Sequence, residues 1–312
     1  MASTSDILIV AEVGGKVGWG HLSRASKLYH ILLPYFDVEL AVVNRQSWTD
    51  SQLEQQFSLK GATAKLLISD GLSLKALISN KVKYESLISL SYLSDVNDEA
   101  DLVVAPALNG LANDPKIYTG LNAILCNIPD DDQLIKQDVH DESNIEIGVC
   151  LGGADVDCLG PSMVSYINEH GHSARLFSPS KKSNNSFECF LQRKLVKGEV
   201  NKFPYYDLKD CRVTVTQGGL TAVELSLLGM PIIIRTRKGF GDAYHFLKDK
   251  NYAVTADLND PKEIAKLAVR LCEDEEWVRK TRYEGIKLKS TIDESYWLNL
   301  SHGFINGERN YA

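Results

Sequence analysis

The feature that most constrains the fold is one segment in the second half of the chain. Val213–Thr216 is a short β-branched run, and Gly218 and Gly219 permit a tight turn that side chains would block. Thr221–Leu228 has helical spacing, and Ile232–Ile234 is a second apolar run. A strand, turn, helix and strand in this order predict a parallel α/β sheet.

The start of the helix in this segment is suited to bind a diphosphate. Backbone amides there lack intrahelical partners, and the helix dipole adds positive charge. Gly218 and Gly219 would let a phosphate approach the backbone, and Thr221 could cap the helix or donate to the phosphate. Glu224, one turn later, could reach a ribose. The alternative is an ordinary strand–helix turn whose glycines only make it tight.

A second unit of this kind opens the chain. Ile7–Ala11 is an apolar run, and the loop that follows, 12–21, contains four glycines. A helix is expected from about His21 to Leu33, with an apolar stripe at Leu22, Ala25, Leu28, Leu32 and Leu33. The loop matches neither the Walker pattern nor the Rossmann dinucleotide pattern, so it predicts a different anion site.

Strand and helix patterns alternate through both halves of the chain. Further strands are expected at 38–43, 65–68, 86–90, 102–105, 123–126, 145–151 and 174–177, and further helices at 161–170, 243–250, 261–272, 275–288 and 294–304. We therefore expect two doubly wound, Rossmann-like α/β domains, 1–138 and 139–312, joined by the acidic segment 130–142. The last helix could pack back on the first domain, and a ligand would bind between the domains.

Composition narrows the class of protein. The net charge of −7 argues against a nucleic-acid partner, because such proteins neutralise phosphates with basic residues. No apolar run approaches the ~18 residues that span a bilayer, and the first residues lack the features of a secretory signal. The six cysteines show no CxxC spacing, which favours reduced thiols in a cytoplasmic protein.

No metal or other cofactor is expected. His170 and His172 are close in sequence but lack further ligands nearby, and no Asp-x-Asp motif is present. Helix-end amides and nearby cations can neutralise a leaving diphosphate without a metal.

Three motifs occur in an informative order: 18–24 (Gly-Trp-Gly-His-Leu-Ser-Arg), 152–155 (Gly-Gly-Ala-Asp), and 218–224 (Gly-Gly-Leu-Thr-Ala-Val-Glu) followed by Gly229-Met-Pro231. Together they resemble the UDP-sugar hydrolase of pseudaminic acid biosynthesis. That family is related to the lipid-linked N-acetylglucosaminyltransferase of peptidoglycan synthesis. The resemblance implies the GT-B fold, with the sugar side in the first domain and the nucleotide side in the second.

By this resemblance His21 is the catalytic base, and Gly18 and Gly20 shape its loop. Histidine changes charge near neutral pH, which suits proton removal. The alternative is a histidine that only caps or packs its helix. Arg24 could orient His21, bind a phosphate or pair with a surface carboxylate, and Asp155 could bind substrate or cap a helix.

The resemblance also implies that Gly218, Gly219 and Thr221 hold the diphosphate and that Glu224 holds the ribose. The sugar side departs from the family pattern. An Asp-x-Tyr motif appears here as Asp70-Gly-Leu72, and the Asn-Gln that follows the last Gly-x-Pro strand is absent.

Three functions follow from these motifs. The first is hydrolysis of a UDP-linked acetamido-deoxy sugar in pseudaminic-type acid or surface-glycan biosynthesis. The second is an inverting GT-B glycosyltransferase with a UDP-sugar donor, and the third is a nucleotide-sugar-binding protein without catalysis. Each binds a small-molecule nucleotide sugar, and the transferase also needs an acceptor hydroxyl. The choice between monomer and homodimer stays open.

Overall fold

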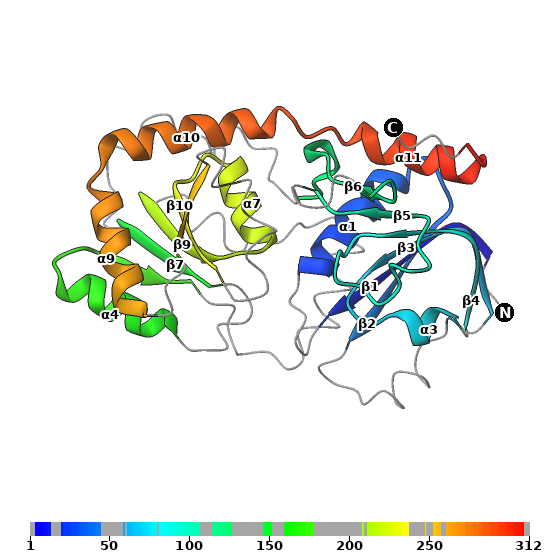
Figure 1. Ribbon diagram of the computed structural model, residues 1–312, viewed down its shortest axis with the longest axis horizontal. Coiled ribbons are helices and arrows are strands. Elements are labelled where there is room, and N and C mark those ends of the chain that lie inside the picture. The colour runs from blue at the N-terminus through cyan, green and yellow to red at the C-terminus, as the bar shows by residue number, and fades with distance from the viewer. Residues whose placement is uncertain are drawn as a thin grey trace. The chain divides into compact units, whose positions relative to one another are not determined.

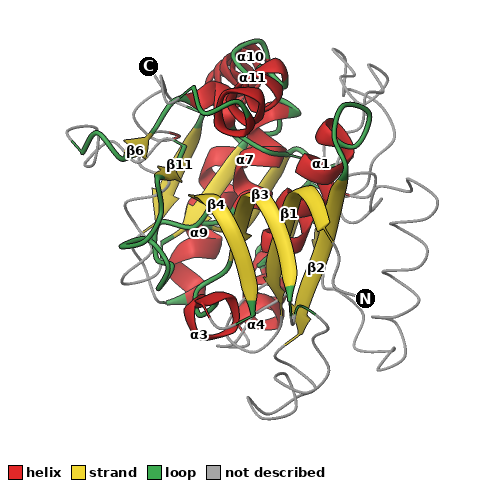
Figure 2. Cartoon of the chain, turned by 90° about the vertical axis from the view of Figure 1, so that its right-hand side faces the viewer, coloured by secondary structure: helices red, strands yellow, loops and turns green. Residues whose placement is uncertain are grey.

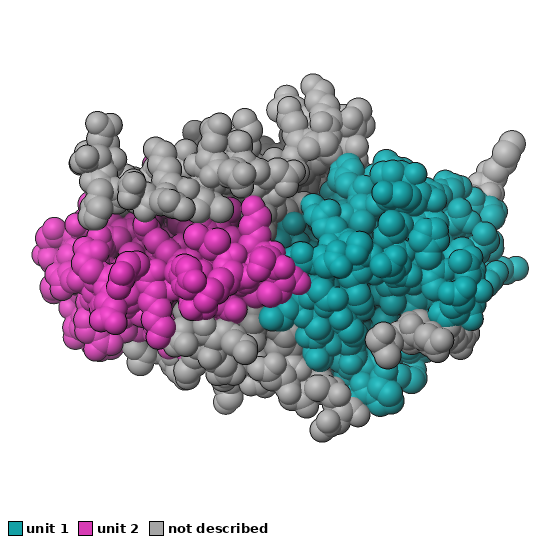
Figure 3. All heavy atoms as spheres, turned by 90° about the horizontal axis from the view of Figure 1, so that it is seen from above, with its two compact units in different colours: residues 1–126, 292–312 teal, residues 127–291 magenta. Residues whose placement is uncertain are grey.

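The computed structural model describes residues 4–13, 20–44, 59, 61–79, 81–106, 114–126, 146–151, 159–177, 208, 211–236, 247, 252–256 and 260–308 (Figure 1). The chain divides into two compact units, which Figure 3 colours separately. Unit 1 comprises Met1–Cys126 and Ile292–Ala312, and unit 2 comprises Asn127–Thr291. The boundary expected near residue 138 lies outside the described residues and stays a prediction.

Unit 1 is built on one parallel sheet. Its strands are β1 (Thr4–Val13), β2 (Val38–Asn44), β3 (Ala62–Asp70), β4 (Val82–Ser89), β5 (Leu102–Val104) and β6 (Ile117–Tyr118). They are arranged in the order β2-β1-β3-β4-β5-β6, and every pairing is parallel. Figure 2 shows β2, β1, β3 and β4 side by side in one twisted layer. The helices of this unit are α1 (Gly20–Leu32), α3 (Lys75–Ser79) and α11 (Ser295–Ile305).

The burial of β1 and α1 follows from their sequences. Ile7, Leu8, Ile9 and Val10 are all buried, as expected for a central parallel strand covered on both faces. Helix α1 buries every predicted member of its apolar stripe except one. That exception, Leu33, is 45% exposed because the helix ends at Leu32, so its assignment to the stripe was wrong.

Helix α11 belongs to unit 1 and packs against α1 and β3. Trp297 on this helix is 1% exposed, and its Nε1 donates to the carbonyl oxygen of Ala123 at 3.3 Å. The strand expected at 123–126 was wrong. A 3-10 turn, Leu121–Ala123, ends there, and 124–126 belong to no helix or strand. The carbonyl of Ala123 accepts from Trp297.

Unit 2 has a second parallel sheet. Its strands are β7 (Ile147–Cys150), β8 (Ala174–Leu176), β9 (Val213–Gln217), β10 (Ile232–Arg235) and β11 (Ala253–Ala256), in the order β11-β10-β9-β7-β8. All of its pairings are parallel. Its helices are α4 (Leu159–Glu169), α7 (Leu220–Leu227), α9 (Pro261–Cys272) and α10 (Glu275–Lys289). The core packs Ile147, Val149, Val213, Val215 and Ile233 with apolar residues of α4 and α9. The prediction of two parallel α/β domains is confirmed.

Each sheet contains a point where the winding direction reverses. In unit 1 the chain places β2 on one side of β1 and β3 on the other, so the reversal lies between β1 and β3. In unit 2 it lies between β7 and β9 for the same reason. Ligands of doubly wound sheets bind beyond the carboxyl ends of the strands at these reversals. The ends of β1, β3, β7 and β9 are therefore where a site is expected.

Candidate functional site

The carboxyl end of β3 carries a buried acid. Asp70 is the last residue of this strand, lies beside Ala11 of β1 in the sheet, and is 0% exposed. His21 is the second residue of α1, and Arg24 lies one helical turn further on. Both side chains reach Asp70 from the helix, so β3 and α1 bring three charged or titratable groups together.

Hydrogen bonds define the geometry of this trio, His21, Asp70 and Arg24. His21 Nδ1 bonds to Asp70 Oδ1. Arg24 donates twice to the same carboxylate, from Nη2 to Oδ1 at 2.6 Å and from Nε to Oδ2 at 3.0 Å. Because an ionised carboxylate only accepts, Nδ1 of His21 carries the hydrogen, and in the neutral form of the ring the lone pair is on Nε2. The 3.1 Å approach of Arg24 Nη2 to Nδ1 then joins two donors and is not a hydrogen bond.

Electrostatics keep Asp70 ionised. Burial alone would raise the pKa of this carboxyl, but the charge of Arg24 and then that of His21 in its protonated form, with hydrogen bonds from both, outweigh the burial and lower the pKa. The ionised acid fixes the ring of His21, whose side chain keeps 16% exposure. A histidine oriented by a buried carboxylate, with one nitrogen able to accept a proton, is the arrangement of a general base.

Sequence reasoning missed Asp70 as a member of the site. In the sequence Asp70 stands out only as part of a departure from the family pattern. Of the three roles considered for Arg24, one was to pair with a carboxylate, but a surface carboxylate was expected, whereas Asp70 is buried. The signal was an acid at the predicted carboxyl end of a buried strand, directly before a glycine. That signal could have placed Asp70 at the sheet edge, although its contact with α1 follows only from the fold.

In unit 2 the carboxyl end of β9 runs into the glycine turn and α7. Gly219 is the N-cap residue of α7, with φ 157° and ψ −176°, a conformation that residues with a side chain rarely adopt. No side chain caps the helix, so the capping role considered for Thr221, the second helical residue, was wrong. A Cβ at Gly219 would meet no atom within 4 Å, and the backbone there is open on that side. In the first turn the amide of Ala222 donates to the carbonyl of Gly219 at 3.1 Å, and the uncapped helix start suits an anion.

Other residues of this region lie deeper. Glu224 on α7 is 3% exposed, and Arg235, the last residue of β10, is 4% exposed. Arg235 is paired in the sheet with Gln217, the residue before the glycine turn, and so places a cation at the same edge. The contact of Glu224 with a ribose stays a prediction.

The predicted site residues thus fall into two groups and a remainder. Gly20 opens α1 and stands beside His21, while Gly218, Gly219, Thr221 and Glu224 lie together in unit 2. Gly18 and Asp155, with the motif 152–155, lie outside the described residues. The structure therefore joins His21 and Arg24 through Asp70, and their roles stay predictions.

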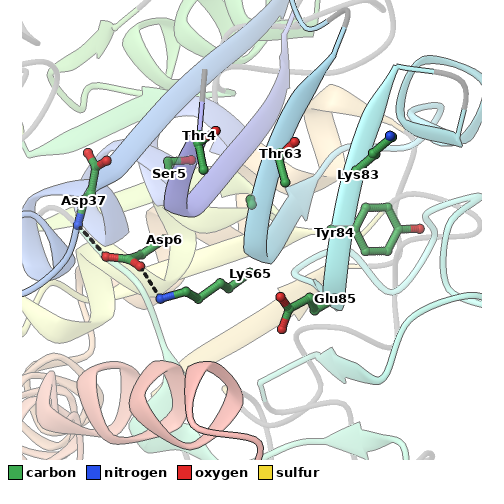
Figure 4. A pocket seen from close by; sticks show the side chains of 10 residues that line it. Thr4, Ser5, Asp6, Asp37, Thr63, Lys65, Lys83, Tyr84 and Glu85 are labelled. Carbon is green, nitrogen blue, oxygen red and sulfur yellow. Dashed lines mark hydrogen bonds and ion pairs between the residues drawn. The ribbon is translucent and has the colours of Figure 1, made fainter. Parts of the chain in front are cut away.

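A groove of about 440 Å³ lies at the opposite edge of the unit 1 sheet. Figure 4 shows that its side chains come from the amino ends of β1, β3 and β4 and from Asp37, just before β2. Asp6 bonds to Lys65 Nζ at 2.8 Å and accepts from the Asp37 amide at 3.3 Å. Since parallel sheets bind ligands at their carboxyl ends, we do not assign this groove to the trio's chemistry.

Nowhere in the described ranges do three or more His, Cys, Asp or Glu side chains gather in a way that could hold a metal ion. None of the described helices is long and apolar enough to cross a membrane. The four described cysteines, Cys126, Cys150, Cys211 and Cys272, are buried, in agreement with the expectation of mostly buried thiols.

Comparison with known proteins gives a fold but no close relative. No protein-family profile matches the chain, and no curated protein matches it. Among solved structures, the glycotransferase of kitacinnamycin is 10% identical with a TM-score of 0.59, covering 98% of this chain and 100% of that chain. HepE of Anabaena in complex with UDP-glucose is 12% identical with a TM-score of 0.58 (97% and 100%). The spinosyn rhamnosyltransferase SpnG with spinosyn aglycone is 11% identical with a TM-score of 0.55 (95% and 100%).

The fold is that of the GT-B glycosyltransferases. Identities of 10–12% establish this fold and nothing finer. The expected GT-B architecture is thus confirmed over nearly the whole chain. The particular resemblance to the hydrolase of pseudaminic acid biosynthesis has no counterpart among these three structures.

Proposed function

We propose that the protein is an inverting glycosyltransferase that uses a UDP-sugar donor, with His21 as its general base. The observation that carries the proposal is the trio, in which a buried, ionised Asp70 leaves Nε2 of His21 able to accept a proton. The GT-B fold supports it, since HepE, a structural neighbour with this fold, is known in complex with UDP-glucose.

The proposed reaction is a single displacement. Nε2 of His21 takes the proton from an acceptor hydroxyl as its oxygen attacks the anomeric carbon, and the bond from that carbon to the diphosphate oxygen breaks. The new bond forms on the face opposite the leaving group, which inverts the anomeric centre. The resulting imidazolium is stabilised by Asp70, to which Nδ1–H already donates.

Unit 2 would stabilise the leaving group. The diphosphate gains negative charge as the bond breaks, and the uncapped amides at the start of α7 present partial positive charge without a metal. Arg235 adds a cation at the same sheet edge. Binding the nucleotide and activating the nucleophile are thus assigned to different units.

Hydrolysis of a UDP-acetamido sugar is the second candidate. The motifs at 18–24, 152–155 and 218–224 favour it, and nothing in the trio distinguishes an alcohol from water as the nucleophile. A binding protein without catalysis has less support, because His21 and Asp70 are hydrogen-bonded as a base and its orienting carboxylate would be.

Release of UDP from a panel of UDP-sugars tests the proposal. Each donor is incubated with and without acceptor alcohols of three kinds: sugars, lipid-linked sugars and hydrophobic aglycones. The comparison uses His21→Ala and, as a matched control, His30→Ala at the other end of α1. We expect UDP release and a glycosylated product only with an acceptor, and a loss of about a hundredfold or more in kcat for His21→Ala alone.

The outcomes separate the candidates. Release of UDP and free sugar in buffer without acceptor, lost in His21→Ala, would establish the hydrolase instead. If UDP raises the melting temperature but no UDP-sugar is turned over, the protein binds nucleotide sugars without catalysis. Equal activity of His21→Ala and the wild type would show that His21 is not the base.

A further inference from the structure

We propose that Glu12 is a positioning residue that fixes the Asp70 carboxylate and, through it, the ring of His21. The inference rests on the proposed function of His21, and it assigns a role to an acid that the trio itself does not include. Glu12 lies at the carboxyl end of β1, on the strand next to β3, and is 1% exposed.

Glu12 binds the backbone directly after Asp70. Its Oε2 accepts from the amide of Leu72 at 2.6 Å and from the amide of Ser73 at 3.0 Å. Two amides on one carboxylate oxygen make a charge-assisted clamp on the turn that leaves β3. The clamp joins the end of β1 to the end of β3, across the reversal of the sheet.

The close approach of Glu12 requires glycine at position 71. A Cβ on Gly71 would lie 2.6 Å from Cβ of Glu12 and 2.7 Å from its Oε2, and neither distance is tolerable. Successive strand side chains point to opposite faces, so Glu12 meets the turn on the face away from Asp70. The Asp70 side chain is consequently held by His21 and Arg24 on one face, while Glu12 holds the amides of Leu72 and Ser73 from the other.

This arrangement matters because the trio depends on the direction of one carboxylate. Asp70 has to meet His21 and the two donors of Arg24 simultaneously. Those contacts survive only if the end of β3 keeps its place, and small displacements of a catalytic group have large effects on rate. Without the clamp, the turn at 71–73 would lose the acceptor for two of its amides.

The test compares Glu12→Leu, which removes the acceptor, with Glu12→Gln, which keeps an oxygen at the same distance from the backbone. Gly71→Ala provides an independent variant, because its methyl group would push Glu12 aside. Asp95 supplies the matched control. Its Oδ1 accepts from the amides of Leu74 at 2.8 Å and Lys75 at 3.0 Å, which is the same kind of clamp further from Asp70.

We expect Glu12→Leu and Gly71→Ala to lower kcat about tenfold or more with little change in KM for the nucleotide sugar, as for a displaced catalytic group. Glu12→Gln should stay within about threefold of the wild type. Asp95→Leu should lower the melting temperature but leave kcat per folded molecule unchanged. Wild-type kcat in both Glu12→Leu and Gly71→Ala would overturn the inference.

A second readout does not depend on turnover. The ring ¹⁵N signals of His21, assigned with His21→Gln, report which nitrogen carries the hydrogen. We expect the Nδ1–H form in the wild type and Glu12→Gln, and a mixture of forms in Glu12→Leu. Unchanged ring signals in Glu12→Leu would overturn the role of Glu12. Absence of turnover in the wild type with every donor, alongside a shift of these signals in Glu12→Leu, would refute the proposed function while supporting the positioning role.

Discussion

The two candidate half-sites differ in which atoms of the protein carry the chemistry. In unit 1, side chains carry the chemistry: Asp70, His21 and Arg24 meet through charge and hydrogen bonds. In unit 2, the backbone carries it, through the turn at Gly219 and the uncapped start of α7. A base needs a titratable group that a buried charge can orient, whereas a diphosphate needs only fixed partial charges.

This difference explains why the sequence alone points to the unit 2 half-site but not to all of the unit 1 half-site. The unit 2 half-site is contiguous, since every predicted member lies between Gly218 and Glu224. The unit 1 half-site joins residues 46 and 49 positions apart, and no spacing rule connects Asp70 to α1. Three predictions test this contrast.

The largest effect is expected from Asp70→Asn. An amide can present its NH₂ group to Nδ1 of His21, which favours the wrong tautomer of the ring, so kcat should fall about a hundredfold or more. UDP affinity, measured by calorimetry, should stay within about twofold, because unit 2 is untouched. Asp101→Asn is the control, because Asp101 is another hydrogen-bonded acid of unit 1, whose Oδ2 accepts from the amide of Leu87 at 2.9 Å. A parallel loss of UDP affinity in Asp70→Asn would contradict the division between the half-sites.

Gly219→Ala should have an intermediate effect, and on binding instead of kcat. The φ of 157° costs a residue with Cβ about 1–3 kcal/mol, and relaxation of the turn would move the first amides of α7. We expect UDP to bind about tenfold more weakly, for ~1.4 kcal/mol of lost binding energy. Gly171→Ala, at φ 86° in equally open space, should cost similar stability without weakening UDP binding. If Gly219→Ala and Gly171→Ala bound UDP with equal affinity, the assignment of the start of α7 as the diphosphate site would be wrong.

The smallest effect is expected from lowering the pH. Because the pKa of Asp70 is lower in the folded protein than in the unfolded chain, its ionised form stabilises the fold above the unfolded pKa, about 3.9. This contribution is lost as the pH falls from there through the folded pKa. Urea unfolding from pH 7 to about pH 3 should therefore show the wild type losing its advantage over Asp70→Asn. A constant difference across that range would mean that Asp70 titrates alike in both states.

Local patterns predicted most strands and helices, because buried parallel strands are apolar runs and the helices carry regular stripes. The patterns failed where a tertiary contact decided the outcome. Residues 123–126 are apolar like a strand, yet Trp297 takes the carbonyl of Ala123. The short strand β11, Ala-Val-Thr-Ala, has too little hydrophobic signal to stand out and is defined by its pairing with β10.

The same limit applies to the half-sites. Thr221 was a reasonable helix cap by residue type, but the turn places Gly219 at that position. His21 and Arg24 could be selected because they share one helix face, while Asp70 and Glu12 required the order of the strands. Residues that act through a neighbouring strand have no local signature.

The position of α11 has a consequence for synthesis on the ribosome. Unit 2 is one continuous stretch of chain, whereas unit 1 takes its last helix from beyond residue 291. Proteins commonly complete their domains in order from the N-terminus. Here the second unit has all of its residues before the first does, and the surface of α1 that α11 packs against stays uncovered until α11 emerges. Nascent chains that stop before residue 295 should therefore engage chaperones through α1.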